Sequence, residues 1–267
     1  MSFFSSLKNL IFPSNLTCDI CGSEIEEVKH KAICEKCEKK LPFIFHGCIK
    51  CGEKIDGEYN VCYNCKHTLR EFDKTYSVFE YSSVAKEMVW KLKYENARYL
   101  AKTMASFLTD HIIKNDIKFD VITFVPAYKA TQKKRGYNQA KLLAEECCKN
   151  LKLNLAQDVL VRVKENTSQV DLSAKERERN IENSFVTNNK SIVKNKVVLV
   201  IDDVLTTGAT MNEVAKVLKD AGASKVIGLT FANTTRKPKF EKDNNQFRQK
   251  AKIKNFENCW NFFIYVL

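Results

Sequence analysis

The sequence predicts an α/β fold, a twisted parallel sheet with flanking helices, preceded by a small cysteine-rich domain. Strand-like and helix-like segments alternate through the body of the chain, which is typical of a parallel sheet. The aliphatic run 197–201 has the composition of a parallel strand buried on both faces. Four CxxC pairs lie within residues 18–65. These three observations predict the fold class, and each predicted element follows from local pattern.

The predicted elements of the body follow one another in the order expected of such a sheet. Large residues alternate in the first strand, and the helices show helical spacing, with Trp90 placed on the apolar face of the first helix. Pro126 closes the second strand, and Gly222 ends the last helix. The predicted strands are 72–81, 120–125, 197–201 and 226–232, the last two paired in parallel, and the predicted helices are 84–93, 97–113 and the segment beginning at Met211.

The cysteine-rich region has the spacing of metal ligands. Each CxxC pair directs two thiolates at one metal, and four thiolates complete a tetrahedral zinc site. Sequential and interleaved pairing of the CxxC pairs are both open, and the apolar connector at 41–45 favours sequential pairing. Few large aliphatic residues are present here, so metal binding is expected to supply folding free energy. The ligands of two structural zinc sites are predicted to be Cys18, Cys21, Cys34, Cys37, Cys48, Cys51, Cys62 and Cys65.

Charge and hydropathy limit the classes of function. The net charge of +12 is concentrated in residues 71–233 (+6) and 234–267 (+5). A basic surface suits nucleic acid or a polyphosphate, although a lysine-rich composition is more often a matter of solubility. No apolar stretch approaches the ~20 residues needed to span a bilayer, and Lys8 and Asn9 interrupt any signal-peptide core. A cytoplasmic protein without membrane insertion is expected.

Two adjacent acids and a hydroxyl-rich loop follow the strand at 197–201. Asp202 and Asp203 come at the predicted carboxyl end of that strand, where open α/β sheets bind ligands. A loop before a helix N-terminus offers N–H groups and hydroxyls to a phosphate, while carboxylates hold sugar hydroxyls or a hard cation. The alternative is an N-capped turn. The predicted phosphate loop consists of Thr206, Thr207, Gly208, Ala209 and Thr210.

A second loop follows the strand at 120–125 and leads into the basic segment KKRGYNQ at 133–139. Such a loop and its cations can hold a diphosphate, whereas a solvated charge run opening a helix is the alternative. The residues predicted to bind diphosphate are Val125, Pro126, Ala127, Tyr128, Lys129, Lys133 and Arg135.

Segment 198–210, VLVIDDVLTTGAT, resembles the phosphoribosyl diphosphate (PRPP) motif of type I phosphoribosyltransferases. The segment RGYNQ at 135–139 looks like a sequence element of the competence protein F (ComF, GntX-like) family. The CxxC pairs in front of such a domain also resemble that family's architecture. The same family's spacing is matched by Arg162, Thr167, Gln169, Leu172, Ser173, Arg177, Asn180 and Phe185. The resemblance implies the type I phosphoribosyltransferase fold. It also implies that Asp202 and Asp203 bind the ribose hydroxyls, that residues 206–210 bind the 5-phosphate, and that Mg²⁺ accompanies PRPP.

The resemblance implies that the protein binds PRPP and acts in natural competence. There it would handle incoming single-stranded DNA together with other DNA-uptake proteins. If it is active, it is a phosphoribosyltransferase. The alternatives are a strand-binding protein with a regulatory or vestigial PRPP pocket and, less favoured, a nucleobase-salvage enzyme. The predicted organisation is a zinc-ribbon domain at 1–70, a phosphoribosyltransferase domain at 71–234 and a basic tail with an aromatic end at 235–267.

Overall fold

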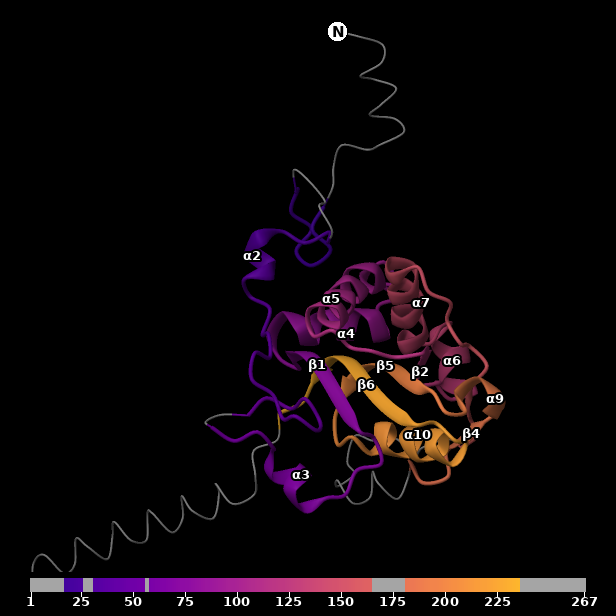
Figure 1. The fold of residues 1–267 in the computed structure, drawn as a ribbon. Helices are drawn as coiled ribbons and strands as arrows, with labels where there is room; N and C mark the ends of the chain where they lie inside the picture. The colour runs from indigo at the N-terminus through magenta and orange to yellow at the C-terminus, as the bar shows by residue number, and fades with distance from the viewer. Residues whose placement is uncertain (1–16, 26–30, 56–57, 165–180, 236–267) are drawn as a thin grey trace, which may run out of the picture. The chain divides into compact units, whose positions relative to one another are not determined.

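A four-stranded parallel sheet with the order β1-β6-β5-β2 organises the chain (Figure 1). The computed structural model describes residues 17–25, 31–55, 58–164 and 181–235. The strands are β1 (Lys74–Glu80), β2 (Val121–Phe124), β5 (Val197–Leu205) and β6 (Lys225–Asn233). Every pairing in this sheet is parallel. The predicted α/β class and the parallel pairing of the last two strands are therefore confirmed.

Helices cover both faces of the sheet. Figure 1 shows α4, α5 and α7 on one side of the strands and α10 on the other. A separate antiparallel pair, β3 with β4, lies near α10. The bounds are α4 (Ser83–Tyr94), α5 (Leu100–Lys114), α6 (Lys129–Arg135), α7 (Gln139–Leu151), α9 (Lys190–Val193), α10 (Ala209–Asp220), β3 (Leu160–Arg162) and β4 (Phe185–Thr187). The N-terminal region adds α2 (Glu35–Glu38) and α3 (Tyr63–His67).

The central strand β5 runs further than its aliphatic core. Val198 to Ile201 have no solvent exposure, as expected of a strand covered on both faces. The strand continues to Leu205, because β6 supplies partners as far as Asn233. Asp202 thus pairs with Thr230 inside the sheet. The predicted end of this strand is wrong by four residues. The two acids therefore lie within β5, near its carboxyl end.

Trp90 does not lie on the apolar face of α4. Its side chain is 50% exposed and stacks on Tyr94, with ring centroids 4.4 Å apart. The buried face of α4 is formed instead by Val84, Ala85, Met88, Val89 and Leu92. The helix is confirmed, and the orientation predicted for Trp90 is wrong.

The connector at 41–45 extends the sheet beside β1. Ile44 N donates to Val78 O at 3.0 Å, and Glu80 N donates to Pro42 O at 2.8 Å. The Phe43 ring packs on Phe79, with centroids 4.6 Å apart. A strand edge left bare is an aggregation risk, and this segment covers the edge of β1.

Some predicted segments lie outside the described residues. These hold six residues of the family spacing and the tail beyond Thr235, and the six residues are Thr167, Gln169, Leu172, Ser173, Arg177 and Asn180. The boundaries at residues 70 and 234 stay predictions. Within the described ranges, no helix combines the length and apolarity needed to cross a bilayer.

Candidate functional site

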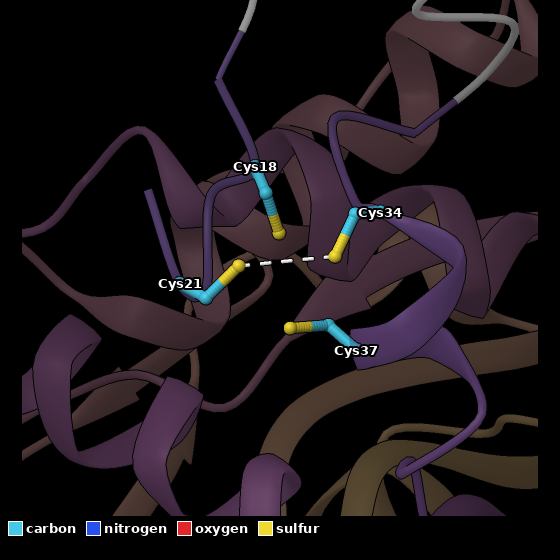
Figure 2. A group of neighbouring side chains, drawn as sticks. All are labelled: Cys18, Cys21, Cys34 and Cys37. Carbon is cyan, nitrogen blue, oxygen red and sulfur yellow. Dashed lines mark hydrogen bonds between the residues drawn. The ribbon is translucent and has the colours of Figure 1, made fainter. Parts of the chain in front are cut away.

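Two groups of four cysteines are assembled in the N-terminal region. In each group all four Sγ atoms lie within 4.8 Å of one another. Figure 2 shows the first group, Cys18, Cys21, Cys34 and Cys37, with the Sγ atoms of Cys21 and Cys34 3.8 Å apart. In the second group the Sγ atoms of Cys51 and Cys62 are 3.6 Å apart. A zinc ion with four thiolates at about 2.3 Å requires sulfur–sulfur distances of about 3.8 Å, so both groups fit structural zinc. Sequential pairing is confirmed, and the second group is completed by Cys48 and Cys65.

The two cysteine groups differ in burial. All four thiols of the second group are buried, whereas Cys21 of the first group is exposed. The second group is also bonded to the sheet, because Asn233 Nδ2 donates to Cys51 O at 3.1 Å and Thr75 N donates to Lys50 O at 2.7 Å. A closed four-thiolate site has no open position for a substrate, so both centres are structural.

A separate cavity of about 270 Å³ lies at the carboxyl ends of β2 and β5. Three predicted segments line it together, and the first of them is far from the other two in sequence. The loop after β2 contributes residues 125–128, β5 contributes Asp202 and Asp203, and the loop before α10 contributes Thr206 and Thr210. Arg135, at the end of α6, is a fourth contribution. Open α/β sheets bind ligands at this position.

The acids of the cavity carry a charge that is only partly compensated. Burial raises the pKa of Asp202 to about 7, and the neighbouring Asp203 carboxylate adds to the increase. Lys93 Nζ lies 2.7 Å from Asp203 Oδ2 and lowers the pKa of Asp202. Burial by itself would lower the pKa of Lys93, yet the Asp203 carboxylate raises it above the usual value. A cation, or a hydroxyl group donated by a ligand, would reduce the remaining electrostatic repulsion between the two carboxylates.

The residues of the hydroxyl-rich loop at 206–210 face two different cavities. Gly208 has φ +77° at the N-cap of α10, and Thr207 Oγ1 accepts a hydrogen bond from Ala209 N at 3.2 Å. Thr206 and Thr210 line the cavity described above. Gly208 instead lies against Arg70, and Ala209 faces a neighbouring cavity that Arg70 also lines. The structure therefore brings two of the five predicted loop residues to the cavity wall.

The basic segment is the end of one helix and the cap of the next. Gly136 has φ +82° and ends α6, and Asn138 Oδ1 accepts from Ala140 N to cap α7. Asn138 Nδ2 also donates to Val125 O at 3.0 Å, which holds this segment against the loop after β2. Arg135 lines the cavity, whereas Lys129 and Lys133 are exposed on α6 and do not line it.

Sequence reasoning missed Lys93, the cation nearest the acids. It lies on α4, between the CxxC pairs and the basic segment at 133–139, and no spacing pattern marks it. Tyr81 also lines the cavity and was missed for the same reason. Arg162 lines it too and had been singled out only within the family spacing.

Fold and site together define a class. They join a phosphoribosyltransferase-type sheet, with acids and a hydroxyl loop at the end of β5, to two four-cysteine centres. The sequence model of the phosphoribosyl transferase domain matches residues 131–265, and that of the double zinc ribbon domain matches residues 7–66. The chain belongs to the phosphoribosyl transferase domain family and is a ComF-type member of it, carrying a double zinc ribbon.

The chain is also similar to individual proteins. Competence protein F of Haemophilus influenzae is 29% identical over 221 residues, which cover 79% of this chain and 94% of the relative. DNA utilization protein YhgH of Salmonella typhi is 26% identical over 214 residues, covering 78% and 93%. A solved structure of the allosteric regulatory enzyme of purine biosynthesis aligns at 16% identity with a TM-score of 0.33 over 50% of this chain, which spans only 26% of that longer chain.

Proposed function

We propose that the cavity at the ends of β2 and β5 binds PRPP. One observation carries the proposal: a single cavity brings the loop after β2 together with the acid pair and the hydroxyl loop, which lie far from it in sequence. Each segment suits a different part of a ribose phosphate. Hydrogen-bond donors of the loops can bind phosphate oxygens, and carboxylates can accept hydrogen bonds from sugar hydroxyls.

The electrostatics of the cavity support the assignment of roles. Asp202 and Asp203 hold the ribose hydroxyls, and Thr206 and Thr210 hold the 5-phosphate at the N-terminus of α10. Arg135 and the loop at 125–128 take the diphosphate. Carboxylate oxygens are ligands that suit Mg²⁺, directly or through water, and the raised pKa of Asp202 is consistent with a site that gains from an added cation. Mg²⁺ bound with PRPP would stabilise the diphosphate as it leaves.

If the site is catalytic, the reaction is a displacement at C1 of the ribose. A nitrogen nucleophile forms the new bond to C1, and the diphosphate leaves with the electrons of the broken C1–O bond. Lys93 and Arg135 line the cavity, and their positive charges would stabilise the anionic oxygens that develop in this step. The biological setting is competence, since relatives bear the names competence protein F and DNA utilization protein.

Isothermal titration of the zinc-loaded protein with PRPP and Mg²⁺ tests the binding proposal. The wild type is expected to bind, and the variant Asp202→Asn/Asp203→Asn is expected to lose most of the heat. Asp220→Asn, at the far end of α10 and exposed, is the matched control and should bind like the wild type. Absence of binding in the wild type, or equal binding in the double variant, contradicts the proposal.

A second candidate is a strand-binding protein in which PRPP is a regulator and not a substrate. The name DNA utilization protein, which the relative from Salmonella typhi bears, favours it. The two candidates differ in chemistry. An enzyme releases diphosphate from PRPP when an acceptor base or strand is added, whereas a regulated binder changes its affinity for DNA and leaves PRPP intact. A coupled diphosphate assay beside a DNA-binding assay separates them.

A further inference from the structure

Two large aromatic side chains are exposed on α4. Trp90 is 50% exposed and Tyr94 is 58% exposed, with their rings tilted by 46° at a centroid distance of 4.4 Å. A scattered exposed aromatic needs no explanation, but a contiguous pair beside charged groups marks an interaction site. The flat faces of these rings suit a ligand that is itself flat.

Cations lie on one side of this pair. The Arg135 guanidinium carbon is 5.2 Å from the centre of the Tyr94 ring, and that of Arg98 is 4.5 Å from the centre of the Tyr137 ring. Lys133 and Lys134 are exposed on α6, and residues 129–135 contain four basic side chains and no acidic one. The surface therefore combines stacking platforms on α4 with the positive charges of α6.

We propose that this surface, formed by Trp90, Tyr94, Arg98, Lys133, Lys134 and Arg135 and here called the aromatic–basic shelf, binds single-stranded nucleic acid. Bases stack on aromatic rings and on guanidinium planes, while lysines bind the phosphates. A single strand fits better than a duplex, because a duplex hides the faces of its bases. The run of cations without acids favours a polyanion over a protein partner.

The shelf is continuous with the candidate PRPP cavity through Arg135. Its guanidinium packs on Tyr94, Arg135 lines the cavity, and its Nη1 donates to Gln139 Oε1 at 3.3 Å. A strand phosphate on the shelf and a diphosphate in the cavity then share one cation. Each ligand is expected to weaken the other by the same factor, because coupling between two sites is reciprocal. This coupling rests on the proposed function, whereas strand binding by the shelf does not.

Fluorescence anisotropy with a labelled oligothymidylate of about 12 nucleotides tests the shelf, without PRPP or Mg²⁺. Trp90→Ala/Tyr94→Ala is expected to weaken binding by about tenfold or more, because each stacked base contributes about 1–3 kcal/mol. Trp90→Phe/Tyr94→Phe keeps the rings and should retain most of the affinity. Tyr59→Ala removes an aromatic that is 66% exposed in the N-terminal region and should change nothing.

A salt series tests the cations. Lys133→Ala/Lys134→Ala should reduce the slope of log K against log salt by about 1.4, the value expected for two lost contacts to a single strand. Lys39→Ala/Lys40→Ala removes another exposed adjacent lysine pair and should leave the slope unchanged. Wild-type affinity in both shelf variants would overturn the proposal. It would also be overturned if Trp90→Ala/Tyr94→Ala altered self-association but not oligonucleotide binding, since the shelf would then be a protein interface.

PRPP added to the strand-bound protein tests the coupling. Strand affinity should fall in the wild type and should not respond to PRPP in Arg135→Ala. An unaltered affinity in a wild type that binds PRPP by calorimetry would refute the shared use of Arg135. If PRPP fails to bind at all, the proposed function fails while the shelf is still judged by the oligonucleotide measurements alone.

Discussion

Asp202 carries an unfavourable charge in the folded protein, and its position suggests why it is retained. Burial and the Asp203 carboxylate raise its pKa to about 7, although Lys93 opposes the increase. Groups with strongly shifted pKa values are concentrated at functional sites, where a ligand restores the missing interactions. We therefore expect the unliganded protein to lose stability to hold this carboxylate in place.

The variant Asp202→Asn tests this expectation through pH. A carboxyl whose pKa is near 7 when folded and about 3.8 when unfolded takes up protons on folding between these values, so its contribution to stability falls as pH rises toward 7. Asparagine has no such dependence. The difference in the free energy of unfolding between Asp202→Asn and wild type should increase by about 1–2 kcal/mol between about pH 5.5 and 7.5.

Urea unfolding of both proteins across this pH range measures the difference, with zinc held saturating. Asp220→Asn serves as the control, because this exposed acid lies outside the site. A difference between Asp202→Asn and wild type that stays constant with pH would contradict the argument. Calorimetry should show that the more stable variant binds PRPP less well, which separates ligand binding from folding.

At the scale of elements, the sequence predicted the aliphatic strands and the helices because their hydrophobic periods are strong. The eight thiolates and the acid pair were predicted for a similar reason, since their spacing is local. The end of β5 was not predicted, because it depends on how far β6 continues to pair with it. Lys93 was not predicted either, because only tertiary packing brings α4 to the acids.

The error at Trp90 has a different cause. At about 100° per residue, Trp90 lies roughly opposite the centre of the stripe formed by Val84, Met88 and Leu92, so helical geometry alone contradicts its assignment to the apolar face. The size and hydrophobicity of tryptophan had favoured burial over its angular position. That position is what leaves the ring available on the aromatic–basic shelf.

Two glycines at equivalent positions in the CxxC turns provide a matched comparison. Gly22 and Gly52 each follow the second cysteine of a pair and have φ +71° and φ +67°. A Cβ added at Gly22 meets nothing within 4 Å, whereas one at Gly52 would come 2.8 Å from Thr75 O and 2.9 Å from Ser77 N. Gly52 is therefore required for close packing on β1, and Gly22 only for its own turn.

Alanine at each glycine should separate these two requirements. Gly22→Ala carries only the left-handed backbone penalty of about 1–2 kcal/mol, which weakens zinc binding at the first centre. Gly52→Ala carries the same penalty and adds overpacking against backbone, about 1–3 kcal/mol more. Competition with a chromophoric chelator and urea unfolding measure both effects. Equal losses in the two variants would show that the contact between Gly52 and β1 is not a tight one.

At the scale of the whole molecule, the two cysteine groups are joined to the sheet in different ways. The second group belongs to the same buried core as the strands, with Cys48, Cys51, Cys62 and Cys65 among its members. The cysteines of the first group are not members of this core, although Ile20 and Ile33 beside them pack against its edge. The first group is also joined to α5 by polar contacts, in which Thr103 Oγ1 donates to Asp19 and Lys31 Nζ lies 2.6 Å from Asp110 Oδ2. Partly exposed polar contacts contribute far less than a shared core.

Loss of the two metals should consequently have unequal effects. Binding of a structural zinc contributes about 10–16 kcal/mol, comparable with the whole stability of a domain, so Cys51→Ser is expected to abolish cooperative unfolding and PRPP binding together. Cys21→Ser, at an exposed ligand of the first centre, should lose one zinc per chain and retain the main unfolding transition and PRPP binding. Metal analysis, calorimetric melting and PRPP titration of the two variants measure these outcomes. If Cys21→Ser unfolds as completely as Cys51→Ser, the first centre stabilises the sheet as strongly as the second. The difference in cysteine burial would then not predict how much each centre contributes to stability.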